Sequence, residues 1–257
     1  MTVTETTFQE PSWLRLGFFL GVLLLCAIWE NKLPRKTLTA SRRFRWVNNL
    51  SLVAFNSLVI ALIMPIAAFQ AAVIAQEQQW GLLNILSLPA WLNIFLTVIL
   101  LDFVIYAQHV VFHHVKPLWK IHRMHHADLD IDVTTGARFH PFEIIISMGV
   151  KIAAVFILGV SPIGIVVFEI VLNASAMFNH SNAKLALSID QKLRNVIVTP
   201  DMHRVHHSVI VKETHSNFGF SFQFGTAFLG HTELSLSWVM MMLLLVCRKL
   251  ETKKSKD

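Results

Sequence analysis

Four long apolar stretches constrain the fold of this 257-residue chain more than any other feature. Three of them, Trp13–Trp29, Leu50–Ala75 and Trp91–Val111, have about the length of a membrane crossing, which needs ~20 mostly apolar residues. Only 15% of the residues are charged, whereas about 25% are charged in a typical soluble domain. We therefore predict an integral membrane protein of the all-α class, a helical bundle that forms a single membrane-embedded domain over residues 1–257.

The fourth stretch, Ile144–Phe178, is long enough for two crossings and carries Ser161 and Pro162 at its middle. A residue that precedes proline disfavours continued helix, so we predict two helices joined by a tight reversal. Leu234–Val246 is too short to span comfortably and is expected to lie on the membrane or against the bundle. Thr2–Pro11 contains no basic residue and no cleavage-like site follows it, so no cleavable signal is predicted.

Positive charge is distributed unevenly over the loops. Six basic residues lie between Lys32 and Arg45, whereas Gln76–Ala90 has none. Because positive loops stay in the cytoplasm, we expect the N-terminus and Gln76–Ala90 outside and Glu30–Asn49 inside. The third span and the hairpin then bring residues 112–143 and 179–230 to the cytoplasmic face. This placement accounts for the net charge of +6 without nucleic-acid binding.

The thirteen histidines all follow residue 108, and eight of them are spaced as pairs or trios on a helix face. Residues three and four apart share one face of a helix, so each trio is expected to aim at one point. The eight are His109, His113, His122, His125, His126, His203, His206 and His207.

Neutral imidazole is a common metal ligand, and this pattern favours metal over surface histidines at a membrane boundary. A tetrahedral ion takes only four ligands, so eight histidines, with His140 and His180 nearby, indicate two ions. Cys26 and Cys247 lie far apart in apolar runs and offer neither a disulfide framework nor a thiolate site. An all-nitrogen set suits iron, copper, nickel or zinc better than magnesium or calcium.

The segments "HVVFH", "HRMHH" and "HRVHH" resemble the three histidine boxes of the fatty acid hydroxylase and sterol desaturase superfamily, HxxxH, HxxHH and HxxHH. The flanking runs "DVTTGARFHPFE", "FNHSN" and "TPDMHRVHH" are similar to bacterial sterol desaturase family proteins and alkylglycerol monooxygenases. The likeness covers residues 102–230, which are the expected catalytic region. One departure is "FGTAFLGH", starting at Phe224, where the family often has a "WD" pair.

The resemblance implies a membrane-bound non-haem di-iron oxygenase that hydroxylates or desaturates a lipid, whether sterol, fatty acyl or ether lipid. Such an enzyme uses O2 and takes electrons from a separate donor, a ferredoxin- or cytochrome-type protein with its reductase. The chain has no nucleotide-binding glycine fingerprint of its own. The implied iron ligands are His109, His113, His122, His125, His126, His140, His180, His203, His206 and His207.

Other polar residues in this region are expected to support the ligands or to stand apart from them. Asp102, Glu143, Asp201 and Asn217 occupy family-like positions and are interpreted as groups that orient ligands or serve the fold. Three histidines have no matching spacing and are expected outside the ligand set: His114, His215 and His231.

Two ionisable residues lie inside the apolar hairpin. Lys151 lies ten residues before Ser161 and Glu169 eight after it, so their depths differ by only ~3 Å. Because a charge at depth needs a partner, we predict that the two side chains pair across the hairpin.

Three other classes of protein fit the sequence less well. A haem electron-transfer protein would use only two histidines per haem. A metal transporter would place ligands along a path at mid-membrane, where this chain has almost none. A zinc hydrolase would need far fewer ligands and an H-E-x-x-H motif, which is missing here.

Overall fold

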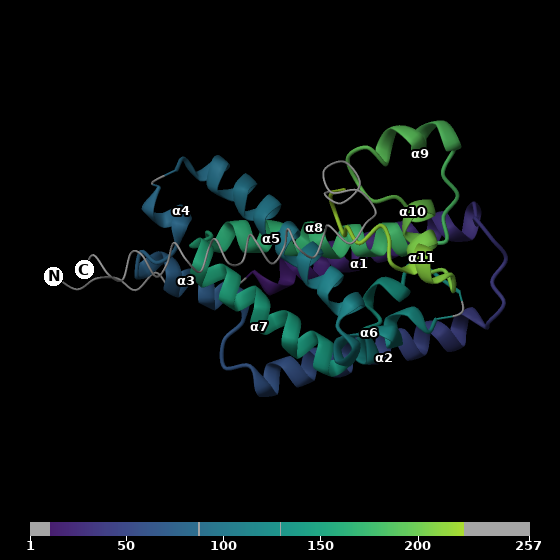
Figure 1. Ribbon diagram of the computed structural model, residues 1–257, viewed down its shortest axis with the longest axis horizontal. Coiled ribbons are helices and arrows are strands. Elements are labelled where there is room, and N and C mark those ends of the chain that lie inside the picture. Colours follow the sequence, from purple (N-terminus) through teal and green to yellow (C-terminus); the bar gives the residue numbers. More distant parts are fainter. Residues whose placement is uncertain (1–10, 87, 129, 224–257) are drawn as a thin grey trace.

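The computed structural model describes residues 11–223 except residues 87 and 129, and this part of the chain is a helical bundle (Figure 1). Its β structure is confined to two isolated bridges, Pro34 with Ala183 and Ile197 with Phe222. The five long helices are α1 (Ser12–Lys32), α2 (Arg42–Ile63), α5 (Ala90–His114), α7 (Pro141–Leu158) and α8 (Pro162–His180). Each belongs to a stretch long and apolar enough to cross a membrane.

Apolar side chains cover the outside of the long helices, as in a bundle that faces lipid. Trp13 and Leu25 of α1, Leu62 of α2 and Trp91 of α5 are all more than two thirds exposed. The core lies instead around α8, which packs against α1, α3 (Ala68–Glu77) and α5. The predicted all-α membrane bundle is therefore confirmed.

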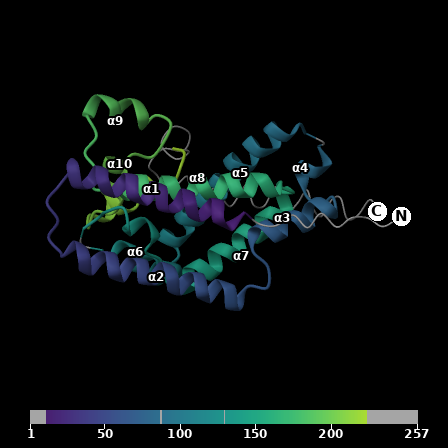
Figure 2. The ribbon, with the colours of Figure 1, turned by 180° about the vertical axis from the view of Figure 1, so that it is seen from behind.

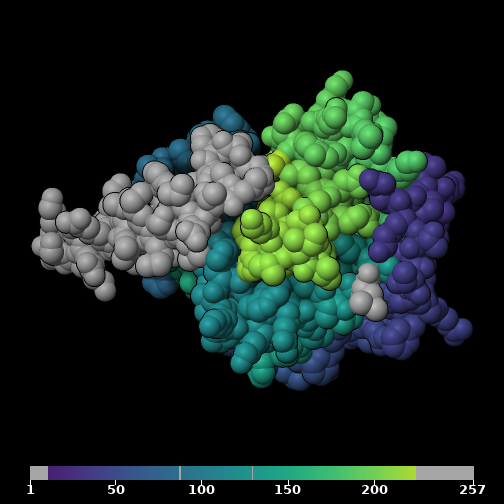
Figure 3. Space-filling model, turned by 45° about the vertical axis from the view of Figure 1, so that its right-hand side comes forward, coloured from purple at the N-terminus to yellow at the C-terminus, as the bar shows by residue number. Residues whose placement is uncertain are grey.

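The connections between helices gather at two opposite ends of the bundle (Figures 1 and 2). One end carries α3, α4 (Leu82–Ile85) and the reversal between α7 and α8. The other end carries the α1–α2 loop and the shorter segments, which Figure 3 shows in green and yellow beside the teal segments. These segments are α6 (Lys116–His126), the 3-10 turn η1 (Thr135–Ala137), α9 (Leu187–Leu193), α10 (Pro200–His206) and α11 (Val211–Thr214).

The expected span Leu50–Ala75 is wrong in its second half. α2 ends at Ile63, and Met64 takes an extended conformation with φ −93° and ψ 116°. Met64 precedes Pro65, and a residue before proline is driven out of the helical region. The chain resumes in α3, whose buried face of Ala68, Ala71, Ala72 and Ala75 packs against α7 and α8.

The predicted reversal at Ser161 and Pro162 is confirmed. α7 ends at Leu158, its C-cap Gly159 has the left-handed φ of 67°, and Ser161 caps α8 by accepting a hydrogen bond from Gly164 N at 3.0 Å. Gly81 lies against Gly159 so closely that a Cβ on Gly81 would be 2.1 Å from the Gly159 nitrogen. The two glycines thus lock α4 onto the reversal, because no other residue fits at either position.

A buried arginine joins α2 to the loop that follows α6. The Arg45 guanidinium makes two 2.8 Å hydrogen bonds to the carboxylate of Asp128, and a 2.6 Å bond to Asp132 Oδ2. Glu30 at the end of α1 accepts from the backbone nitrogens of Val133 and Asn182 at 3.1 and 3.0 Å. These bonds tie the loops of this end to the long helices. Leu234–Val246, the "FGTAFLGH" run and His231 lie outside the described residues.

Candidate metal centre

Nine histidines come together at the loop-rich end in two adjacent groups. In each group the ligand-capable atoms all lie within 4.8 Å of one another. The first group is His109, His113, His122, His126 and His206. The second group is His125, His180, His203 and His207.

Four helices deliver these side chains. α5 supplies His109 and His113, one turn apart, and α8 supplies His180 as its last residue. α6 and α10 each carry one trio, with His207 at the C-cap of α10. Both α6 and α10 have a proline in the first turn, Pro117 and Pro200. Proline is favourable there because the backbone N–H that it lacks would have no partner within the helix.

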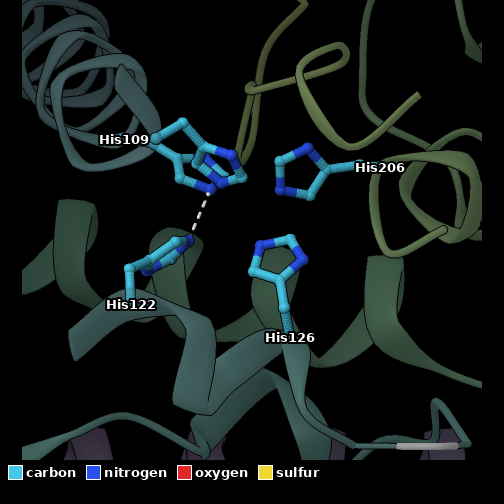
Figure 4. Close-up of side chains that lie close together, drawn as sticks. His109, His122, His126 and His206 are labelled. Carbon is cyan, nitrogen blue, oxygen red and sulfur yellow. Dashed lines mark hydrogen bonds between the residues drawn. The ribbon is translucent and has the colours of Figure 1, made fainter. Parts of the chain in front are cut away.

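The expectation that each trio aims at one point is wrong, because each trio divides between the two groups. The outer pair His122 and His126 joins the first group, and Figure 4 shows these rings facing His109 and His206. The middle member His125 joins the second group. The second trio does the reverse and sends its middle member, His206, to the first group. Residues i+3 and i+4 differ by ~100° around a helix, which is enough to serve two ions.

In five of these imidazoles the outer ring nitrogen, Nδ1, which points away from the group, lies within hydrogen-bond distance of an oxygen atom. His122 Nδ1 lies 2.6 Å from Glu143 Oε1. The other four outer nitrogens donate to backbone carbonyls: His109 to Phe218 at 2.8 Å, His125 to Arg138 at 3.1 Å, His180 to Ala176 at 2.6 Å and His206 to Ser216 at 2.7 Å. The four carbonyl bonds place the proton on Nδ1 and leave the lone pair of Nε2 pointing inward, as at metal-ligating histidines.

The inward nitrogens of different histidines face one another. His109 Nε2 lies 3.2 Å from His122 Nε2, the contact dashed in Figure 4, and His125 Nε2 lies 3.0 Å from His180 Nε2. In the His125–His180 pair both Nδ1 atoms donate to backbone carbonyls, so lone pair faces lone pair. Within the described part of the chain, neither ring nitrogen of His113 has a hydrogen-bond partner. A bound cation in each group would satisfy all of these buried atoms, so the residues fit metal ions.

Burial keeps the imidazoles of α6 and α10 uncharged. Burial lowers the pKa of His122 to about 3. Burial first, and then neighbouring imidazoles, lower the pKa of the remaining histidines of these two segments far below the ordinary value: His125, His126, His203, His206 and His207. Neutral imidazole is the form that offers a lone pair to a metal.

Two further histidines lie close to the groups without joining them. His114 is exposed, and its Nδ1 bonds the Val110 carbonyl at 2.8 Å. The His215 ring centroid lies 5.4 Å from that of His113. Neither belongs to a group, in agreement with expectation.

His140 is the one predicted ligand that lies outside both groups. It is the N-cap of α7, and its Nδ1 accepts a hydrogen bond from Phe142 N at 3.2 Å. Its side chain is therefore used in capping a helix, a role common for residues just before a helical proline. We leave His140 out of the ligand set proposed below.

Replacing His113 with alanine is expected to lower the metal content, whereas His114→Ala is expected to leave it nearly unchanged. The two residues are adjacent in sequence, but only His113 aims its ring nitrogens into a group. Metal analysis of the two purified variants checks this assignment. Metal loss from His114→Ala but not from His113→Ala would reverse it.

Of the four polar residues interpreted as supports, only Glu143 contacts an imidazole of the groups. Asp102 accepts hydrogen bonds from Ser221 N at 3.2 Å and Phe222 N at 3.1 Å, so it anchors the segment after α11. Asp201 pairs with Arg35 at 2.8 Å. Asn217 adopts a left-handed φ of 52°, a conformation that asparagine tolerates, and serves the turn that carries Phe218.

A cavity of about 440 Å³ leads from the first group into the bundle. His109, His122 and Glu143 line one part of it, and Ile105, Phe112 and Phe139 add apolar walls. α1 and α2 border it on two sides with Phe19, Val53 and Ile60. A second pocket of about 340 Å³, lined by His126, His207, Trp119 and Arg123, reaches the groups from the loop-rich end. Neither the cavities nor the carbonyl acceptors could be predicted from the sequence, because both depend on tertiary packing.

Comparison with known proteins agrees with this geometry. The family model described as fatty acid hydroxylase matches residues 94–245, which include all nine grouped histidines. The ornithine lipid hydroxylase OlsE of Rhizobium tropici is 24% identical over 132 residues, which are 51% of this chain and 39% of that protein. The chain thus aligns with well under half of that relative's length. No solved structure matches significantly. The family match spans more than half of the chain, which therefore belongs to the fatty acid hydroxylase family.

Proposed function

We propose that this chain is a membrane-bound non-haem di-iron oxygenase that hydroxylates or desaturates a lipid with O2 and two electrons from a separate donor. The observation that carries the proposal is the pair of buried histidine groups, in which Nε2 atoms of different histidines face one another at 3.0 to 3.2 Å. Membership of the fatty acid hydroxylase family and the similarity to a lipid hydroxylase support a lipid as substrate.

Each histidine group would hold one ion. Imidazole sets without thiolates suit iron, copper, nickel and zinc, and we choose iron because unactivated C–H bonds are beyond side-chain chemistry. Two bound irons would supply the oxidant derived from O2. Glu143 then strengthens His122 as a ligand by accepting its Nδ1–H, and the carbonyl acceptors keep the other rings in their orientation.

The chain's own residues would bring the lipid to this centre. The 440 Å³ cavity has the size of a binding site for one small ligand, ~300–1,000 Å³. Its walls of Ile105, Phe112 and Phe139 exclude water and direct an alkyl chain toward His109 and His122. Because α1 and α2 border the cavity, a lipid would enter it laterally from the membrane.

The histidine end would face the cytoplasm, since the α1–α2 loop at that end holds the cluster of Lys and Arg. The electron donor would dock on this end. Lys116, Lys120, Arg123 and Lys212 are exposed there, near the pocket that reaches His126 and His207. Such a basic surface suits an acidic ferredoxin- or cytochrome-type protein. We retain the single-domain organisation, with residues 102–230 as the catalytic region, as part of this proposal.

Metal analysis of the purified protein, together with lipid profiling of cells with and without it, tests the function. We expect about two irons per chain, one for each histidine group, with no haem absorption band. We also expect a lipid that gains one oxygen or loses two hydrogens only in cells that contain the protein. One zinc per chain, or lipid profiles that do not differ, would refute the oxygenase.

A further inference from the structure

Trp119 of α6 lies between the loop-rich end of the bundle and the first histidine group. It is half-buried and lines the pocket of about 340 Å³ at that end. Its ring centroid lies 4.9 Å from that of His113, 5.3 Å from that of His126 and 6.2 Å from that of His122. Aromatic rings that pack on each other have centroids about 4.5–7 Å apart, so one indole contacts three imidazoles of the same group.

The helical spacing of α6 produces this arrangement. His122 follows Trp119 by three residues and His126 follows it by seven, so the three side chains share one face of α6. His113 reaches the same indole from α5. Because Trp119 and two of the imidazoles belong to one helix, the indole keeps a fixed position relative to the group.

The first group is otherwise largely closed to a protein that approaches from outside the membrane. Four of its five imidazoles are at most 3% exposed: His109, His113, His122 and His206. The larger cavity meets the group inside the bundle, where α1 and α2 border it. The pocket at the loop-rich end reaches the group from the other direction, and its lining includes Trp119 and His126.

The residues around this pocket suit the docking of another protein. Val209 and Val211 line the pocket and are 99% and 71% exposed. Arg123 lines it too and is exposed, as is the neighbouring Lys212. Tryptophan and arginine are enriched among the residues that contribute most to protein–protein binding. The positive charge makes an acidic protein the complementary partner.

We propose that Trp119 is the residue through which electrons pass from an acidic ferredoxin-type donor, docked on this pocket, to the metal of the first group. This inference rests on the function proposed above. In each transfer the reduced donor loses one electron and is oxidised, and the electron reduces one ferric ion to the ferrous state. Trp119 is neither oxidised nor reduced overall, because its ring only connects the donor with three imidazoles.

Anaerobic reduction of the iron-loaded protein by a plant-type ferredoxin tests this route. The protein is held in nanodiscs, and absorbance in a stopped-flow instrument follows the oxidation of the ferredoxin and the reduction of the iron. No O2 is present, so the rate is measured without lipid oxidation. Saturating ferredoxin ensures that weaker docking does not alter the rate.

Variants of Trp119 identify the contribution of its ring. We expect Trp119→Leu and Trp119→Met to slow reduction by at least about 10-fold, which equals ~1.4 kcal/mol of activation free energy. Trp119→Phe keeps an aromatic ring and should retain most of the rate. Either of the first two variants suffices for the test if it retains its iron. An unchanged rate in that variant would overturn the proposal.

Two controls separate the route from the metal centre and from general effects of losing a tryptophan. Dithionite is a small reductant that does not need to dock, so it should reduce all variants at the rate of the unchanged protein. Trp91→Leu removes a tryptophan that is 70% exposed in the first turn of α5, at the opposite end of that helix from His113, and should behave like the unchanged protein. Equal slowing with dithionite and with ferredoxin would overturn the proposal, because the centre itself would then be altered.

The two proposals fail in different ways. A protein that holds no reducible iron would refute the oxygenase, and the route through Trp119 with it. An iron-containing oxygenase that ferredoxin reduces equally well with and without the ring of Trp119 would refute the route alone. Reduction of the unchanged protein by dithionite but not by ferredoxin would also refute the route, since the proposed donor would then not dock.

Discussion

Replacing His180 with alanine is expected to lower the bound metal from about two ions per chain to about one, and to reduce lipid oxidation by more than about 100-fold. Residues that merely orient ligands contribute ~10–100-fold, whereas we propose His180 as a ligand. Its Nε2 lies 3.0 Å from that of His125, 2.9 Å from that of His203 and 3.2 Å from that of His207. The variant leaves three imidazoles in the second group and five in the first.

His140→Ala is the matched control, because His140 also lies outside the three HxxxH and HxxHH segments. It caps α7 and belongs to neither group, so this variant should keep both ions. Metal content per chain and rate of lipid oxidation are measured on both variants. Loss of an ion from His140→Ala, or two ions retained by His180→Ala, would contradict the ligand set proposed here.

Glu169→Gln is expected to lower the free energy of unfolding by roughly 3–5 kcal/mol, the usual cost of removing one partner from a buried ion pair. The change leaves Lys151 and Arg15 without their shared carboxylate in the interior of the bundle. Equilibrium unfolding in detergent micelles, followed by circular dichroism, measures the loss.

Adding Lys151→Met to Glu169→Gln should recover part of that stability, since it removes the lysine that the single variant leaves without Glu169. Equal losses from the single and the double variant would show that Lys151 and Glu169 are not energetically coupled.

The sequence predicted those parts of the fold that depend on local rules. Apolar length marks the spans, and Ser161 before Pro162 marks the reversal. Counting helical rise from that reversal also predicted the Lys151–Glu169 pair, because both residues belong to one hairpin of regular geometry.

The features that sequence did not predict depend on contacts between distant segments. One exception is the end of α2, where Pro65 acts by the same local rule as Pro162, so this break was open to prediction from the sequence. The division of each trio follows from how α6 and α10 face each other. The carbonyls of Phe218 and Ser216 are backbone groups that any residue type would supply. Their role as acceptors for His109 and His206 therefore cannot be predicted from a pattern of side chains.

The contact between Gly81 and Gly159 holds the chain just before α8 against the start of α4. α8 is 19 residues long, which corresponds to ~28 Å, close to the ~30 Å of hydrocarbon in a bilayer. Because Gly159 is held against Gly81, the number of residues in α8 contributes to the depth and the direction of His180 at its other end. One inserted residue would turn His180 by ~100° and shift it by ~1.5 Å. The orientation of a proposed metal ligand thus depends in part on a backbone contact at the opposite end of the bundle.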